Sequence, residues 1–157
     1  MSYLAINTKT KSTALIELSL SSSQTSNQGD IVVFDTLRSA GSHNVSVDAS
    51  GNISLDTSRS YWIQASIDVD RSSLTSSWAF SWYSGSTQLT PADGAYSATW
   101  EYHTSSGTQL GYPNATFTAT YVSSSPASSI NLKADVLAGS SSINTSTKVI
   151  IVEVVQS

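Results

Sequence analysis

The chain contains no cysteine, which excludes disulfide bonds, thiolate metal sites and a cysteine nucleophile. Charge is also scarce, since only 11% of the 157 residues are charged and the net charge is −4. The seven Lys and Arg residues are scattered without a run, so we expect no nucleic acid to be bound through phosphate neutralisation. No segment is apolar for long enough to span a membrane, and we expect no membrane partner.

A secretory signal is also missing from the sequence. Residues 1–20 carry Lys9 and Lys11 inside them and only short apolar alternation afterwards, without a basic start followed by a long apolar run. We therefore expect synthesis in a host cytoplasm, and export, if there is any, by a route other than a cleaved signal.

Hydroxyl groups supply most of the polarity, because Ser and Thr make up about a third of the residues. Such a surface suits exposed β-strands and leaves little long-range field to steer a charged partner. The length fits one sandwich of about eight to ten strands. We expect no second compact domain.

The segment Tyr61–Val69 carries the clearest period-two pattern. Its odd-numbered residues are apolar and its even-numbered residues are polar, so one face is expected to be covered and the other wet. Trp62 alone breaks the wet face, which makes it a candidate for burial against another subunit.

Short runs of the same kind recur along the chain, and no window shows helical spacing. The sequence therefore predicts an all-β fold, an antiparallel jelly-roll sandwich. The expected strands are 14–20, 31–37, 44–47, 52–56, 61–69, 78–83, 96–102, 117–121, 130–136 and 148–155.

The last of these strands, 148–155, is apolar on both faces apart from Lys148 and Glu153. This pattern is typical of a strand inside a sheet rather than at a wet edge, as jelly rolls place their terminal strands. Coverage of both faces also makes Val149 and Ile151 candidates for a subunit interface.

No constellation for catalysis stands out. His43 and His103 lie in no recognisable setting, and the chain has no Gly-x-Ser-x-Gly nucleophile elbow. Each of the three glutamates is expected on an outward strand position, although the eight aspartates leave a glycosidase pair open. We expect a protein that is not an enzyme and that needs no cofactor.

Asp68 and Asp70 are the nearest approach to a metal site. Calcium takes six to eight oxygen ligands, so two carboxylates are only a fraction of a site. A local ion cluster with Arg71 is the favoured interpretation, and only an approach of Asp93 would change it. We predict no metal.

The aromatic residues allow two interpretations. Trp78, Phe80 and Trp82 share one face at period two, as core residues do. The alternative is a sugar-stacking platform, because tryptophan faces bind pyranose rings. Tyr83 lies opposite its strand's apolar stripe and joins Trp62 as an interface candidate, and Tyr112 in its loop is a candidate recognition tip.

The order of these elements resembles the trimeric jelly roll of the tumour necrosis factor and complement globular-head superfamily. The resemblance covers about residues 29–157 and rests on VVFDT, on NISLDTSRSYWIQASIDV, on the aromatic strand and on the hydrophobic last strand. The family has Gly-x-Tyr before its long strand where this chain has Arg59-Ser60-Tyr61, so only the tyrosine carries over. The Phe-Gly signature of the family's last strand is missing here.

Small Ser- and Thr-rich proteins without cysteine or signal peptide also resemble decoration, cement and fibre components of tailed bacteriophages. This resemblance implies a homotrimer on the virion. We expect residues 1–28 to form an N-terminal arm and first strand that reaches a neighbouring subunit, and residues 29–157 to form the jelly-roll domain. The expected function is capsid decoration, in contact with the major capsid protein.

Two other functions remain open. The first is a receptor- or carbohydrate-binding head of a phage fibre or tail, with a cell-surface glycan as its partner. The second, a cytokine-like ligand, is disfavoured because neither a secretion signal nor a membrane anchor is found.

Overall fold

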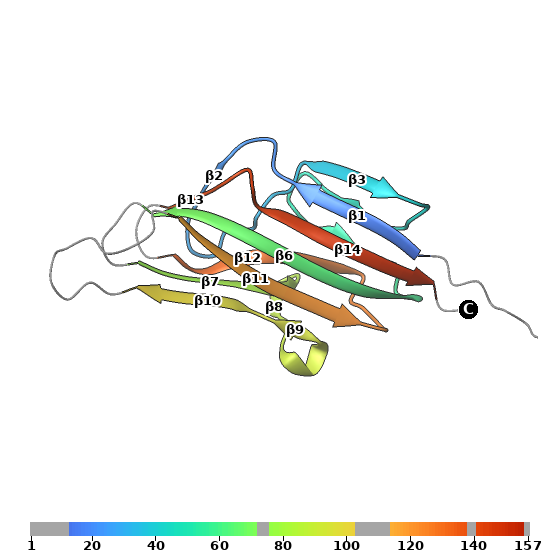
Figure 1. Ribbon diagram of the computed structural model, residues 1–157. Coiled ribbons are helices and arrows are strands. Elements are labelled where there is room, and N and C mark those ends of the chain that lie inside the picture. Colours follow the sequence, from blue (N-terminus) through green and yellow to red (C-terminus); the bar gives the residue numbers. More distant parts are fainter. Residues whose placement is uncertain (1–12, 72–75, 103–113, 138–140, 156–157) are drawn as a thin grey trace, which may run out of the picture.

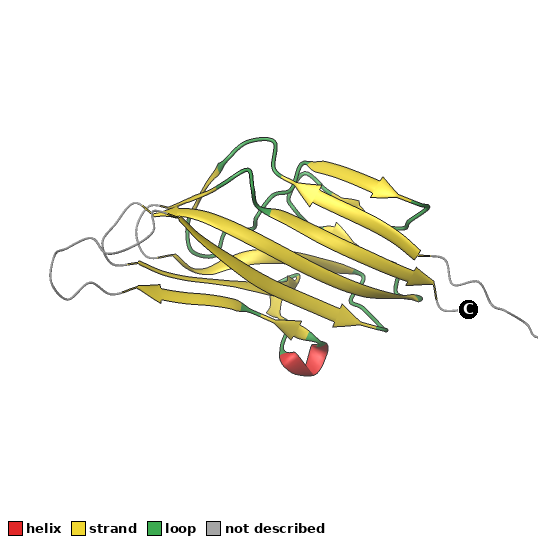
Figure 2. Ribbon diagram, in the orientation of Figure 1, coloured by secondary structure: helices red, strands yellow, loops and turns green. Residues whose placement is uncertain are grey.

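The structure, a computed structural model, describes residues 13–71, 76–102, 114–137 and 141–155. Two antiparallel sheets pack face to face with the core between them, as Figures 1 and 2 show. The only helix among the described residues is one turn of 3-10 helix, η1 (Pro91–Asp93). The predicted all-β, antiparallel jelly-roll sandwich is confirmed.

The first sheet has eight strands. Most of its width runs in the order β3-β1-β14-β6-β11-β9. Beyond the first residue of β14, β13 pairs with β6, and β2 pairs with β13. The bounds are β1 (Thr13–Ser19), β2 (Gln24–Ser26), β3 (Thr36–Ala40), β6 (Arg59–Arg71), β9 (Ala95–Tyr96), β11 (Asn114–Ser123), β13 (Ser141–Ile143) and β14 (Lys148–Val155).

The second sheet has six strands in the order β10-β7-β12-β5-β4, and β8 also pairs with β7. Its strands are β4 (Ser46–Val47), β5 (Ile53–Ser54), β7 (Ser76–Ser84), β8 (Thr87–Gln88), β10 (Ala98–Tyr102) and β12 (Ser129–Leu137). The predicted hairpin before β6 is present as β4 and β5, and Gly51 in its turn has a φ of 82° that favours glycine.

Period-two patterning explains the core. On β6, Tyr61, Ile63, Ala65, Ile67 and Val69 are buried and the side chains between them are half-buried or exposed, as predicted. Trp78, Phe80 and Trp82 of β7 face them from the other sheet and are also buried. These aromatic residues are therefore core residues, and they do not form a sugar-stacking platform.

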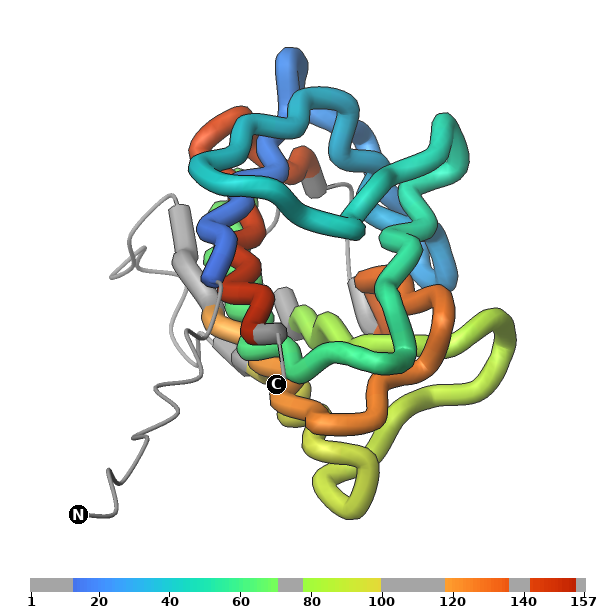
Figure 3. The backbone as a smooth tube through the Cα atoms, turned by 90° about the vertical axis from the view of Figure 1, so that its right-hand side faces the viewer, coloured from blue at the N-terminus to red at the C-terminus, as the bar shows by residue number. Residues whose placement is uncertain are grey.

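The strands at the two ends of the described chain lie at the middle of the first sheet. β14 pairs with β6 on one side and with β1 on the other, in register from Thr13 opposite Val154 to Ser19 opposite Lys148. Figure 3 shows the same two strands side by side in one wall around the core. An interior position for the last strand was predicted and is confirmed.

The pairing of β1 changes the expectation for an N-terminal arm. Residues 13–19 pair with β14 and β3 of their own chain, so they belong to the sandwich and do not add a strand to a neighbour. Only the residues before Thr13 are left for the arm, and these lie outside the described residues.

Two predicted strands are broken where the chain changes sheet. Residues 29–32 bond to β12, for example through Val32 N to Leu132 O at 2.9 Å. The chain then crosses to the first sheet, where Asp35 N bonds to Ser19 O at 3.2 Å and β3 begins at Thr36. The run 96–102 is split at Ser97, because β9 pairs with β11 and β10 pairs with β7. A continuous strand pairs within one sheet, so each of these segments is interrupted where it passes from one sheet to the other. The alternation of apolar and polar residues does not reveal this crossing.

Candidate functional site

Exposed apolar side chains gather on the outer face of the first sheet. A cross-strand row, here called the apolar row, consists of Ala40, Leu15, Val152, Trp62 and Val122 on β3, β1, β14, β6 and β11. Each of these residues is directly opposite the next in the sheet register. Leu15 is 52% exposed, Trp62 40% and Val122 47%. The row crosses five neighbouring strands, which lie side by side in Figure 1.

Tyr96 extends this surface at the β9 end. It is 56% exposed and lies opposite Thr120 of β11. Thr120 is two residues from Val122 and therefore on the same face of the sheet. Gly94 O accepts a hydrogen bond from Val122 N at 2.9 Å, and this bond fixes the chain just before β9 against β11. All four large hydrophobic side chains that are exposed in the described part of the chain therefore share one sheet face.

The residues beside the apolar row become polar toward one end of the strands. Ile150 and Val154 flank Val152 on β14 and are half-buried. Two rungs away from the apolar row, Lys148 lies opposite Ser19 and Ser66, and its Nζ is 3.9 Å from Glu17 Oε2. An apolar centre with a polar rim is the usual composition of a protein–protein interface.

A hollow of about 250 Å³ lies on this face at the β3 end of the apolar row. It is here called the β1–β3 hollow, and its lining residues are Leu15, Glu17, Arg38, Ser39, Ala40 and Ile150. Its walls combine aliphatic groups with one carboxylate and one guanidinium. The two ends of the apolar row thus differ, with the hollow at one end and the projecting ring of Tyr96 at the other.

A solved structure described as "Structure of Eiger TNF from S. frugiperda" superposes on the chain with a TM-score of 0.58 and 12% sequence identity, over 92% of each chain. The chain has a TNF-like jelly-roll fold. Neither a family model nor a curated protein matches it. No helix in the described residues is long and apolar enough to cross a membrane.

The predicted interface residues have different positions in this TNF-like jelly roll. Trp62 lies at the centre of the apolar row. Val149 and Ile151 are fully buried in the core of the single chain, so the prediction that they contact another subunit is wrong. On β14 it is the alternate set, Ile150, Val152 and Val154, that faces outward.

Tyr83 and Tyr112 are the other two candidates. The Tyr83 hydroxyl donates a hydrogen bond of 2.5 Å to Asp135 Oδ1, and Lys133 Nζ lies 4.5 Å from the centre of its ring. The bond to Asp135, followed by burial, raises the pKa of Tyr83 to about 12. Its ring is held and partly covered on the second sheet, away from the apolar row. Tyr112 lies outside the described residues.

A second group of functional-looking side chains, built around Glu153, is structural. Glu153 is 1% exposed although we predicted an outward position for it, and that prediction is wrong. Its carboxylate accepts hydrogen bonds from Arg59 Nη1 at 2.8 Å, Tyr61 Oη at 2.9 Å and Asn44 N at 3.0 Å. Burial is the main cause that raises the pKa of Tyr61 to about 12. The network joins the loop before β4 to β6 and β14.

Tyr61 is the residue that carried the family resemblance. Its hydroxyl also accepts a hydrogen bond from Asp56 N at 3.1 Å, and Arg59 Nε lies 3.3 Å from Asp56 Oδ2. Because Tyr61 is buried and bonded on both sides, it supports the start of β6 and is not a binding residue.

The aspartates and histidines form no site in the described chain. Asp68 accepts a hydrogen bond from Ser146 Oγ, and no group of three or more His, Cys, Asp or Glu side chains in the described residues is placed to hold a metal. His43 Nδ1 accepts from Val45 N at 3.2 Å, within its own loop. The side chain of Arg71 and the whole of His103 lie outside the described part.

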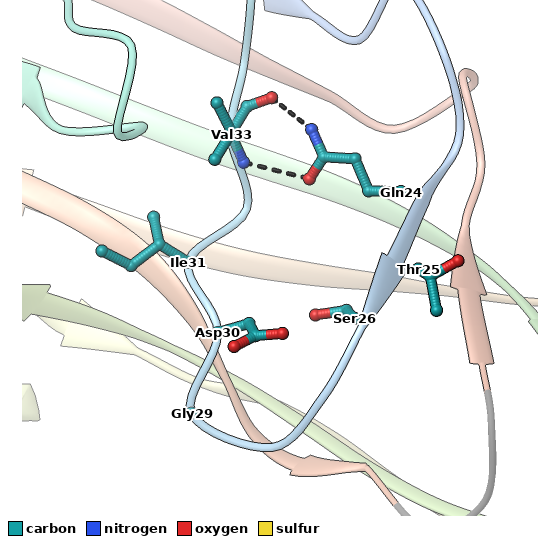
Figure 4. A pocket seen from close by; sticks show the side chains of 7 residues that line it. All are labelled: Gln24, Thr25, Ser26, Gly29, Asp30, Ile31 and Val33. Atoms are coloured by element: carbon teal, nitrogen blue, oxygen red, sulfur yellow. Dashed lines mark hydrogen bonds between the residues drawn. The ribbon is translucent and has the colours of Figure 1, made fainter.

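A further hollow opens at the edge of the sandwich, where β2 and residues 29–33 diverge toward different sheets. Figure 4 shows the Gln24 amide bridging the main chain of Val33, donating to its carbonyl and accepting from its N–H. This amide replaces a main-chain rung between the two segments. The feature therefore closes an edge and presents no cluster of reactive groups.

Proposed function

We propose that this protein is a non-enzymatic virion structural protein, a capsid decoration or cement protein that works as a homotrimer. Its apolar row is buried between copies of the chain, and its mechanism is contact rather than chemistry. The partner beyond the trimer is the major capsid protein. We base the virion location on the resemblance in composition to decoration proteins of tailed bacteriophages.

The apolar row is the observation that carries the proposal. Large apolar side chains clustered on one face of a monomer mark an interaction surface. Full burial of such a side chain is worth about 1.5–3 kcal/mol, so covering side chains that are about half exposed gives about 1 kcal/mol each. Three or four such side chains give about 3–4 kcal/mol per subunit, which is one part of the favourable free energy of association. A second copy of the chain supplies the same apolar surface.

Attachment to the capsid is assigned to residues 1–12. β1 begins at Thr13, opposite Val154, so a segment before it starts from the middle of the first sheet. A trimer carries three such segments, and simultaneous engagement converts weak single contacts into persistent attachment.

Two measurements test the proposal. Light scattering on a sizing column over a range of dilutions is expected to give three times the chain mass.

Co-sedimentation with purified capsids is expected to retain the full chain and to lose a variant without residues 1–12. That deletion leaves every described strand intact, so a matching circular dichroism spectrum serves as its control. Retained attachment, or a monomer at all concentrations, would contradict the proposal.

A carbohydrate-binding head of a phage fibre or tail is the second candidate. The observation that favours it is the exposure of two aromatic rings, Trp62 and Tyr96, on one face. A glycan array separates the two functions, because a decoration protein binds no sugar. Binding that is lost in Trp62→Ala and kept in Tyr83→Phe would favour the second candidate.

A further inference from the structure

We infer that each contact in the homotrimer places Tyr96 of one subunit in the β1–β3 hollow of the next. The inference rests on the proposed trimer and names the contact that would close it. A ring of three identical subunits needs a head-to-tail interface, in which two different patches of the same chain meet. The two ends of the apolar row are two such patches.

The shapes of the two ends are complementary. Tyr96 is the most exposed of the large hydrophobic side chains described, and it stands at the β9 end. The hollow of about 250 Å³ lies at the opposite end of the row, between β1 and β3. In this arrangement Trp62, midway along the row, is buried between the two contacts that its subunit makes. A two-fold dimer would instead place Trp62 against its own copy.

The chemistry of the hollow suits a tyrosine. Leu15, Ala40 and Ile150 offer aliphatic walls to the faces of a ring. Glu17 also lines the hollow and offers a hydrogen-bond acceptor, and Arg38 offers donors. A phenol hydroxyl that becomes buried needs such a partner.

The charges at the two ends also differ in sign. Arg38 is exposed at the hollow, where Lys148 and Glu17 form a pair beside it. At the other end Asp93 precedes Tyr96 by three residues, and it accepts hydrogen bonds of 2.8 Å from both Thr90 N and Thr90 Oγ1. These bonds hold the pKa of Asp93 below its ordinary value, so it is ionised at neutral pH. Opposite charges at the two ends favour a head-to-tail contact over a two-fold one.

Thiol cross-linking tests the inference cleanly, because the full chain has no cysteine of its own. Ala40→Cys marks the hollow and Thr120→Cys marks the partner of Tyr96. Within one chain these positions are four strand spacings apart, about 19 Å, too far for a short bis-maleimide. The double variant is expected to give covalent dimers and trimers, and each single variant is expected to give neither.

The outcomes separate the inference from the proposed function. A trimer in light scattering without cross-links in the double variant overturns the inference and leaves the trimer standing. Dimers from either single variant also overturn the inference, because they show a two-fold contact. A chain that is monomeric at every concentration overturns both the inference and the trimer.

Affinity provides a second readout. Tyr96→Ala is expected to raise the concentration at which the trimer dissociates by at least about tenfold, as removal of a buried aromatic anchor does, and Tyr96→Phe by less. Tyr83→Ala, an aromatic deletion on the second sheet, is the matched control and is expected to leave the trimer unchanged. An equal effect of the two alanine variants would overturn the inference.

Discussion

Arg59 and Glu153 form an ion pair of 2.8 Å although the carboxylate is almost wholly buried and the two residues are 94 positions apart in the sequence. The pair links the first residue of β6 to its neighbouring strand β14. Removing one partner of a buried pair leaves the other charge uncompensated, so the stability of this region depends on both residues.

Glu153→Ala is expected to lower the free energy of unfolding by about 3–5 kcal/mol, because Arg59 and the Tyr61 hydroxyl lose their common acceptor. Urea denaturation at one fixed protein concentration measures this change. Glu17→Gln removes one partner of the exposed 3.9 Å pair with Lys148, and it is the control, with an expected change within about 0.5 kcal/mol. Equal effects of the two substitutions would show that the network adds nothing to stability.

Alkaline pH is expected to destabilise the fold. Tyr61 and Tyr83 both have a pKa raised from 10.0 to about 12, so between these values the folded chain retains protons that the unfolded chain has lost. Their contribution to stability is full below pH 10 and is lost as the pH rises toward 12. Thermal melting at a series of pH values, with tyrosinate absorbance, follows the loss.

The double variant Tyr61→Phe, Tyr83→Phe is the control for the alkaline experiment. It is less stable at neutral pH because it lacks the bonds to Glu153 and Asp135, but its stability is expected to fall less steeply between pH 10 and 12. An unchanged slope would mean that other groups cause the alkaline loss.

Trp62→Lys is expected to dissociate the oligomer without unfolding the chain. The substitution places a charge at the centre of the apolar row, where association would have to bury it unpaired. Light scattering reports the mass and circular dichroism reports the fold. Thr87→Lys, at an exposed position of β8 in the second sheet, is the matched control and should leave the mass as it is.

Gly94→Ala tests how β9 is positioned. Gly94 has a φ of 84°, and a Cβ there would lie 1.9 Å from Val122 O. We expect a loss of more than about 2 kcal/mol, since the left-handed conformation alone costs about 1–2 kcal/mol, together with weaker association because Tyr96 moves. Gly85→Ala, with a φ of 61° and nothing within 4 Å, isolates the cost of the conformation. The prediction fails if both variants lose the same amount.

The sequence predicted the fold wherever one face of a strand was plainly apolar and the other polar. Tyr61–Val69 and the stripe Trp78, Phe80 and Trp82 were oriented correctly for this reason. Lys148–Val155 is apolar on both faces, so its period-two pattern could not show which face is inward. Glu153 lies on the inward face, where Arg59 pairs with it from 94 positions away, and such a distant pairing leaves no local trace in the sequence.

The candidate site was only partly predictable for the same reason. Trp62 was identified because it interrupts a polar face. Leu15 and Val122 join it only through the register of β1 and β11 with their neighbours. Tyr96 was assigned to a continuous strand, whereas its exposure follows from the crossing between sheets at Ser97. Cross-strand register is a property of the assembled sheet.

The position of β1 and β14 at the middle of the first sheet has a consequence for biosynthesis. β14 lies between β1 and β6, so residues 13–19 complete their pairing only after residues 148–154 have been synthesised. Until then the edges of β1 and β6 that β14 covers are exposed. Contacts of such long sequence separation make folding slow, and the insertion of β14 protects these two edges from pairing with other chains.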